Sequence, residues 1–156
     1  MIVLDINVFP SVFKSSSSDY EEFYHVRNWV EKERKACFVF GGTKYNSELR
    51  KMTQYYDILK ELKNTRQLIE INSQLIDDYA KQLKSICTDE SFNDEHIVAI
   101  LNVSGCKLVC TKDSEAVPYL KNRDFYDDKK APKIYSSSKN KKLLSKKNIV
   151  KLKNIC

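Results

Sequence analysis

The sequence predicts an α/β fold, a three-layer sandwich with a mostly parallel central sheet of four to five short strands. Short apolar runs alternate with longer segments whose apolar residues recur at helical spacing, as in parallel sheets covered by helices. The chain of 156 residues is 42% hydrophobic and 31% charged, which suits one domain with a substantial core. Gly-rich phosphate loops and the G-x-S-x-G motif of Ser hydrolases are absent.

The first part of the chain predicts two strands around one helix. Ile2–Asp5 is the expected first strand, followed by a short structured segment at residues 9–13 and a serine loop at residues 15–18. A helix is predicted from Asp19, because its first turn carries acids and its end carries Lys and Arg, as the helix dipole favours. Residues 36–42 then predict a buried strand closed by two glycines.

The middle of the chain predicts a helix, a strand and a second helix. Apolar residues recur at 3.6-residue spacing over residues 43–64, which predicts one long amphipathic helix. Residues 66–72 form the next expected strand. Ser73 is the expected N-cap of a helix that continues to Ile86.

The last part predicts one more helix and two strands. Residues 91–105 predict a helix that begins with Ser91 and Asp94 at the spacing of a capping box and ends at a glycine. The apolar run at residues 106–110 is the next strand, and residues 132–136 form a late one.

Composition and charge restrict the class of protein. No apolar run approaches the roughly 18 to 20 residues of a membrane-spanning helix, so we expect a cytoplasmic protein without a membrane partner. The five cysteines include no C-x-x-C pair, which favours reduced, buried thiols over a zinc site. Residues 129–156 hold ten lysines and no acid, whereas the whole chain has a net charge of +6. We therefore divide the chain into a domain at residues 1–137 and a basic tail at residues 138–156.

Acidic side chains from separate segments are predicted to meet at one edge of the sheet. Asp5 and Asp113 each follow an apolar strand, and the carboxyl ends of parallel strands share an edge where ligands bind. Asp113 could instead cap a turn of helix that follows it. Asp94 opens a crossover helix whose N-terminus returns to that edge, and it shares a face with Ile97 and Leu101, so it should point over the sheet.

Glu48 completes the predicted group, because it lies about one turn into the helix after the second strand, on the side of Tyr45 and Met52. His96 lies two residues from Asp94 and is expected to face away from it. Crowded carboxylates repel one another unless a cation neutralises them, and hard oxygen ligands suit Mg²⁺ or Mn²⁺. Such a cation activates a water and stabilises an in-line displacement at phosphorus, which implies phosphodiester hydrolysis.

Three stretches resemble the PIN-domain family. MIVLDINVF is similar to the family's opening, a strand-terminal Asp followed two residues later by Asn or another small polar residue. NDEHIVAILNVSGCKLVCTKD resembles the family's helix that begins with Asp, passes a small-residue turn and enters a strand ending in Thr-x-Asp. GGTKYNSEL resembles the start of the helix that carries the family's Glu. The resemblance spans roughly residues 1–137.

The resemblance implies a PIN-like nuclease domain with Mg²⁺- or Mn²⁺-dependent endoribonuclease activity, whose products carry a 5′-phosphate and a 3′-hydroxyl. It implies a toxin of a toxin and antitoxin pair, or a nuclease of RNA processing or defence, with RNA and an antitoxin or other protein as partners. The residues that the resemblance assigns as metal-binding and catalytic acids are Asp5, Glu48, Asp94 and Asp113. Those that it assigns to orienting ligands or contacting phosphate are Asn7 and Thr111.

The basic tail leaves two interpretations open, a solvated end or an arm that contacts RNA phosphates. The candidate contacts are Lys139, Lys141, Lys142, Lys146 and Lys147. Apolar residues between these lysines could dock on the domain or on a partner, either an antitoxin or a second protomer of a homodimer. The alternative function is therefore a non-catalytic PIN-like module that binds RNA or a protein. A phosphatase with an aspartyl nucleophile would need a second acid where Asn7 stands.

Overall fold

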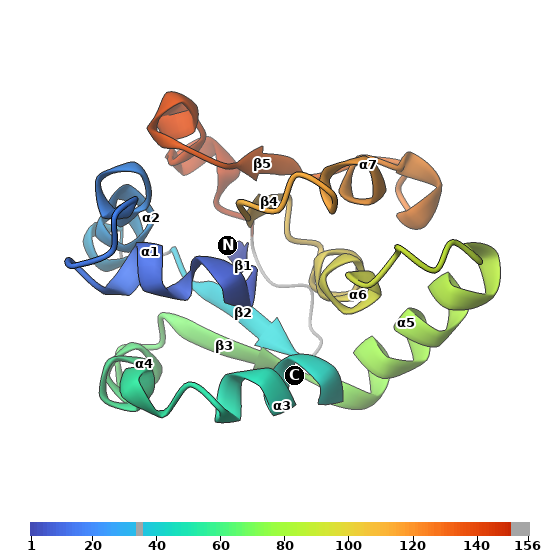
Figure 1. The fold of residues 1–156 in the computed structure, drawn as a ribbon, viewed down its shortest axis with the longest axis horizontal. Coiled ribbons are helices and arrows are strands. Elements are labelled where there is room, and N and C mark those ends of the chain that lie inside the picture. The colour runs from blue at the N-terminus through green and yellow to red at the C-terminus, as the bar shows by residue number, and fades with distance from the viewer. Residues whose placement is uncertain (34–35, 151–156) are drawn as a thin grey trace.

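The computed structural model describes residues 1–33 and 36–150, which form a three-layer α/β sandwich around a five-stranded sheet (Figure 1). All strand pairs are parallel in the order β3-β2-β1-β4-β5, which confirms the predicted fold class. The strands are β1 (Ile2–Leu4), β2 (Phe38–Gly41), β3 (Leu68–Ile71), β4 (Leu108–Cys110) and β5 (Lys133–Tyr135). At the centre, Val3 pairs with Val39 on one side and with Val109 on the other.

Helices cover both faces of the sheet, as Figure 1 shows. They are α1 (Phe9–Phe13), α2 (Tyr20–Lys32), α3 (Thr43–Arg50), α4 (Tyr56–Asn64), α5 (Ser73–Ile86), α6 (Glu95–Ser104) and α7 (Val117–Leu120). The helices α1, α2 and α4 pack in one core with Ile2 and Leu4, whereas α5 and α6 pack in another core with Val3. Because successive strand residues point to opposite faces, one short strand contributes to both cores.

The prediction of one helix over residues 43–64 is wrong, because the segment forms two helices. The break lies at Met52, with φ −96° and ψ 53°, and a 3₁₀ turn at Thr53–Tyr55 follows it. Tyr45 of α3 is buried in the core of α5 and α6, whereas Leu59 of α4 is buried in the opposite core. One straight helix could not serve both faces of the sheet, so packing overrides the local periodicity.

Two helix starts also differ from the expectation. Asn72, rather than Ser73, caps α5, because its side chain accepts hydrogen bonds from backbone N–H groups of the first turn. The predicted capping box of α6 does not form, since the helix begins at Glu95 and the Asp94 side chain makes no capping bond. Ser91 lies outside this helix. The Asp94 carboxylate is therefore available for other interactions.

The tail lies against the domain as far as the structure describes it. It contains two 3₁₀ turns, η4 (Ser138–Leu143) and η5 (Lys146–Asn148). The backbone N–H of Ser138 donates to Glu22 Oε2 at 2.8 Å, and Leu143 packs half-buried in the core of α1, α2 and α4 together with Leu144 and Ile149. Docking on the domain is thus the arrangement that the apolar tail residues adopt here.

The sequence predicts neither a membrane-spanning helix nor a disulfide. Within residues 1–33 and 36–150, no helix combines the length and the apolarity needed to cross a bilayer. The described cysteines, Cys37, Cys87, Cys106 and Cys110, are free thiols, and Cys156 lies outside the described residues.

Candidate active site

Asp5 and Thr111 meet at the carboxyl edge of the sheet because β1 and β4 are neighbouring parallel strands. Thr111 Oγ1 donates to Asp5 Oδ2 at 2.7 Å, although the two residues are 106 positions apart in the sequence. The backbone N–H of Asp113 donates to the same Thr111 Oγ1 at 3.0 Å. Thr111 is buried, so its hydroxyl fixes the position of both acidic residues.

Asp94 joins this pair from the N-terminus of α6. Burial, followed by the negative charges of Asp5 and Asp113, raises the pKa of Asp94 to about 6. The structure therefore brings three of the four predicted acids within electrostatic reach of one another. Each comes from a different segment: one follows β1, one follows β4, and one opens α6.

Asp5 itself is held between opposing influences. Burial raises its pKa, and the charge of Asp113 adds to that, whereas hydrogen bonds from Thr111 and Asn7 act in the other direction. The Asn7 backbone N–H donates to Asp5 Oδ1 at 3.4 Å. The Asn7 side chain is exposed beside this carboxylate, where a ligand can reach it.

Asp113 combines the two roles that the sequence left open. Its Oδ1 atom accepts hydrogen bonds from the backbone N–H groups of Glu115 at 2.8 Å and Ala116 at 3.3 Å. This is the capping interaction of a turn, although α7 itself begins only at Val117. Its Oδ2 atom has no hydrogen bond within the described part of the chain, so capping leaves one oxygen available to a ligand.

Glu48 approaches the site from α3 through Tyr45. The Tyr45 hydroxyl donates to the carbonyl oxygen of Leu4 at 2.7 Å, directly before Asp5 in the chain. Burial, and then the charges of Asp5 and Glu48, raise the pKa of Tyr45. Tyr45 is thus near both Asp5 and Glu48, whereas Glu48 is not among the charges that shift the pKa of Asp5 or Asp94, so the fourth predicted acid borders the group of three.

The residues fit a hydrated divalent cation. Among residues 1–33 and 36–150, no three His, Cys, Asp or Glu side chains are grouped closely enough to hold a metal ion by themselves. Mg²⁺ requires fewer, because it binds through one or two carboxylates and completes its shell with water and substrate phosphate. Asp5 and Asp94, which burial and neighbouring charge disfavour as anions, are the carboxylates that a cation would stabilise most.

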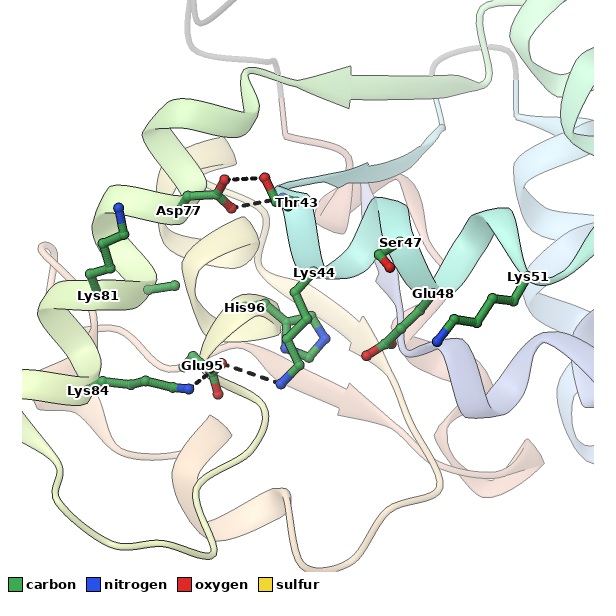
Figure 2. Close-up of a pocket in the computed structure, with 11 residues that line it drawn as sticks. Thr43, Lys44, Ser47, Glu48, Lys51, Asp77, Lys81, Lys84, Glu95 and His96 are labelled. Atoms are coloured by element: carbon green, nitrogen blue, oxygen red, sulfur yellow. Dashed lines mark hydrogen bonds and ion pairs between the residues drawn. The ribbon is translucent and has the colours of Figure 1, made fainter.

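A cleft with a volume of about 610 Å³ lies between α3, α5 and the start of α6 (Figure 2). Its lining includes Glu48 and four lysines, Lys44 on α3, Lys51 directly after α3, and Lys81 and Lys84 on α5. Such a concentration of cations next to a group of carboxylates favours a substrate with several phosphates.

Glu95 and His96 form the buried part of this cleft, and sequence reasoning did not assign either of them to a site. Glu95 Oε1 forms ion pairs with Lys44 Nζ at 3.3 Å and with Lys84 Nζ at 3.2 Å. The sequence predicts only that His96 points away from Asp94. In the structure His96 is buried, and it lines the cleft together with Glu48. The adjacency of Glu95 to Asp94 was the available signal, but only the packing of α3 and α5 supplies the lysines.

The tail lysines lie elsewhere on the surface. The five candidates named above are all exposed, and none of them lines the cleft of α3, α5 and α6. Lys141 instead borders a smaller cavity of about 280 Å³ with His25, Asn28 and Trp29 of α2. An RNA contact through the tail would therefore use the α2 side of the molecule.

Comparisons with family models, with curated proteins and with solved structures found no match to this chain. A functional assignment therefore depends on the side chains of this protein and on the sequence motifs quoted above.

Proposed function

We propose that this protein is a Mg²⁺- or Mn²⁺-dependent endoribonuclease that hydrolyses phosphodiester bonds in RNA. The observation that carries the proposal is the convergence of acids on Thr111, whose Oγ1 donates to Asp5 Oδ2 at 2.7 Å and accepts from the backbone N–H of Asp113 at 3.0 Å. Asp94 lies near enough that the charges of Asp5 and Asp113 add to burial in raising its pKa to about 6. Carboxylates that repel one another destabilise a fold unless a cation joins them. Strongly shifted carboxylates at the carboxyl edge of a parallel sheet are typical of functional sites.

Asp5 and Asp94 would hold the cation, and Asp113 and Glu48 would reach it directly or through a water. When bound, the cation lowers the pKa of a water and neutralises charge on the scissile phosphate. Thr111 keeps Asp5 in one orientation through the 2.7 Å hydrogen bond.

The choice of RNA and the biological role come from the PIN resemblance. RNA fits the lysine-lined cleft, and the exposed Asn7 side chain could contact a phosphate. The same resemblance favours a toxin of a toxin and antitoxin pair, or an RNA-processing or defence nuclease. The proposed location is the cytoplasm, as expected from the lack of a long apolar run in the sequence. An antitoxin, another protein or a second copy of the chain would be its protein partner.

Cleavage of a labelled single-stranded RNA in the presence of Mg²⁺ or Mn²⁺ tests the proposal. The variants Asp5→Asn and Asp113→Asn should lose activity and keep the fold by circular dichroism, and a chelator should abolish cleavage by the unmodified protein. Asp57→Asn, which changes an exposed acid of α4, is the matched control and should cleave normally. Undiminished cleavage in both site variants would refute the assignment.

A non-catalytic RNA-binding module is the second candidate, because the exposed lysines of the tail lie apart from the acids. Deleting residues 139–156 separates the two functions. If the enzyme proposal is right, the shortened protein still cleaves RNA with metal below its lowered melting temperature, and its affinity for RNA falls. A full-length protein that binds RNA through its tail, and that cleaves RNA with neither Mg²⁺ nor Mn²⁺, would support the second candidate.

A further inference from the structure

The cleft between α3, α5 and α6 has the features of a ligand site in its own right. Its volume of about 610 Å³ lies within the range of roughly 300 to 1,000 Å³ that is typical of small-molecule sites. Figure 2 shows Lys44 and Glu48 on one side of the cleft and Lys81 and Lys84 on the other, with Glu95 and His96 between them. Each wall thus carries two lysines and one acid, Glu48 on the α3 side and Asp77 on the α5 side, and the two walls enclose a polar floor.

The walls suit a phosphate group. Lys44 and Lys84 belong to different helices, yet both donate to the single oxygen Glu95 Oε1. Their side chains are 41% and 62% exposed, so both ammonium groups can also reach a ligand in the cleft. Lys81 adds a third ammonium group on the α5 wall, where its side chain is 78% exposed. Lysine ammonium groups are point charges with several donors and are frequent phosphate ligands.

The buried polar atoms of the floor need a hydrogen-bond donor, which a phosphate dianion does not have. Glu95 is only 4% exposed, and its second oxygen, Oε2, has no hydrogen-bond partner among residues 1–33 and 36–150. His96 is 6% exposed, and its Nδ1 atom also lacks a partner within these described residues. Buried polar atoms without partners are costly, so they are uncommon unless a ligand or a water completes them. A ligand for this cleft should therefore carry an N–H donor in addition to an anionic group.

The Glu95 carboxylate selects a donor specifically. Its Oε1 atom pairs with the ammonium groups of Lys44 at 3.3 Å and Lys84 at 3.2 Å, an arrangement that a carboxylate anion makes. As an anion, Glu95 can only accept hydrogen bonds.

The cleft shares elements with the proposed catalytic acids. Glu48 lines the cleft and lies close enough to Tyr45 to raise its pKa, as Asp5 does, and Glu95 directly follows Asp94 in the chain. A group bound here would be the next part of a strand whose scissile phosphate lies at the acids.

From this geometry we infer that the cleft is a nucleotide subsite, in which Lys44 and Lys84 bind a phosphate and Glu95 reads the base. The inference rests on the proposed function for its link to a strand, but not for the binding itself. Cytosine, adenine and guanine carry amino groups that can donate a hydrogen bond to a carboxylate. On the Watson–Crick edge of uracil the only N–H lies between two carbonyl oxygens, and the carboxylate repels these oxygens. Glu95 thus excludes uracil from the position next to the cut.

Binding of nucleoside 5′-monophosphates to the full chain in a chelating buffer tests the inference without any cleavage step. In NMR titrations of the unmodified protein, CMP should bind about tenfold more tightly than UMP, the value expected for one hydrogen bond to a charged group. Glu95→Gln should bring the two affinities together, because an amide both donates and accepts. Lys84→Ala should weaken both nucleotides by a similar factor and keep their ratio.

The control is Lys60→Ala, which removes an exposed lysine of α4 on the opposite side of the sheet and should change neither affinity. Equal binding of CMP and UMP to the unmodified protein would overturn the role of Glu95, and absence of binding by both would overturn the subsite. Selective binding by a protein that never cuts RNA would instead reject the nuclease proposal and support the subsite. A Glu95→Gln protein that melts far below the unmodified one is replaced by Glu95→Asp, which should keep the selectivity only in part.

Discussion

Replacing Asp94 by Asn should stabilise the metal-free protein while it removes cation binding. Asp94 opens α6 without capping it, and its carboxylate instead lies near Asp5 and Asp113. An asparagine has nearly the same shape and carries no charge, so it removes the repulsion and keeps the volume. The fold should therefore gain stability at the expense of the site.

The magnitude follows from the pKa. The folded state raises the pKa of Asp94 from 3.8 to about 6, so the folded protein holds this proton more tightly than the unfolded chain does. Ionisation of Asp94 thus destabilises the folded state as the pH rises from about 4 to 6, and above this range the loss is complete. A shift of about two units corresponds to ~3 kcal/mol at neutral pH for a fully buried group. Asp94 is only partly buried, so solvent screening lowers this to ~2 kcal/mol, of which ~1 kcal/mol develops between pH 5 and pH 7.5.

Urea unfolding at pH 5 and pH 7.5 in a chelating buffer measures the effect. The advantage of Asp94→Asn over the unmodified protein should grow by ~1 kcal/mol between the two pH values. Asp57→Asn, an exposed acid of α4, should change the free energy of unfolding by less than ~0.5 kcal/mol at either pH. Adding Mg²⁺ should stabilise the unmodified protein and leave Asp94→Asn unchanged.

A constant difference between the two proteins at all pH values would show that Asp94 has an ordinary carboxylate environment. In that case the argument from crowded acids fails, and the proposed function loses its main support. Equal stabilisation of both proteins by Mg²⁺ would instead place the cation away from Asp94.

Three further outcomes are expected. Thr111→Val removes the hydroxyl that joins Asp5 to the Asp113 backbone, and should cost ~1 to 3 kcal/mol by urea unfolding and weaken Mg²⁺ binding ~10- to 100-fold by calorimetry. Gly41→Ala should give largely insoluble protein, because φ is +149° there and an added Cβ would lie 2.5 Å from the carbonyl oxygen of Ile71; normal solubility would contradict this. Deleting residues 139–156 should lower the melting temperature, since apolar tail side chains pack on the domain, and an unchanged melting temperature would show that this packing contributes little.

The acids at the ends of β1 and β4 could be found from the sequence because their placement follows from simple rules. An apolar run that ends in an acid places that acid at the carboxyl end of a strand, and parallel strands bring these ends to one edge. Asp94 was predicted for the same reason, since a crossover helix must begin where the strands end. The sequence did not predict that the Asp94 side chain leaves α6 uncapped, because capping depends on whether the residues before Asp94 join the helix.

The cleft could not be predicted in this way. Lys44 and Glu95 are 51 residues apart, and their ion pair exists only because α3 and α6 pack near each other. The break at Met52 has the same origin, since it lets α3 face one core and α4 the other. Neither pairing leaves a periodic signal along the chain.

The α/β class, the parallel sheet and the edge where the acids lie follow from hydrophobic periodicity along the chain, because this pattern indicates which face of each element is buried. Tertiary packing sets which helices are neighbours, where the segment at residues 43–64 breaks, and which lysines surround Glu95. The physical reason is that burial patterns are local properties of the chain, whereas contacts between distant helices depend on the packing of two whole cores.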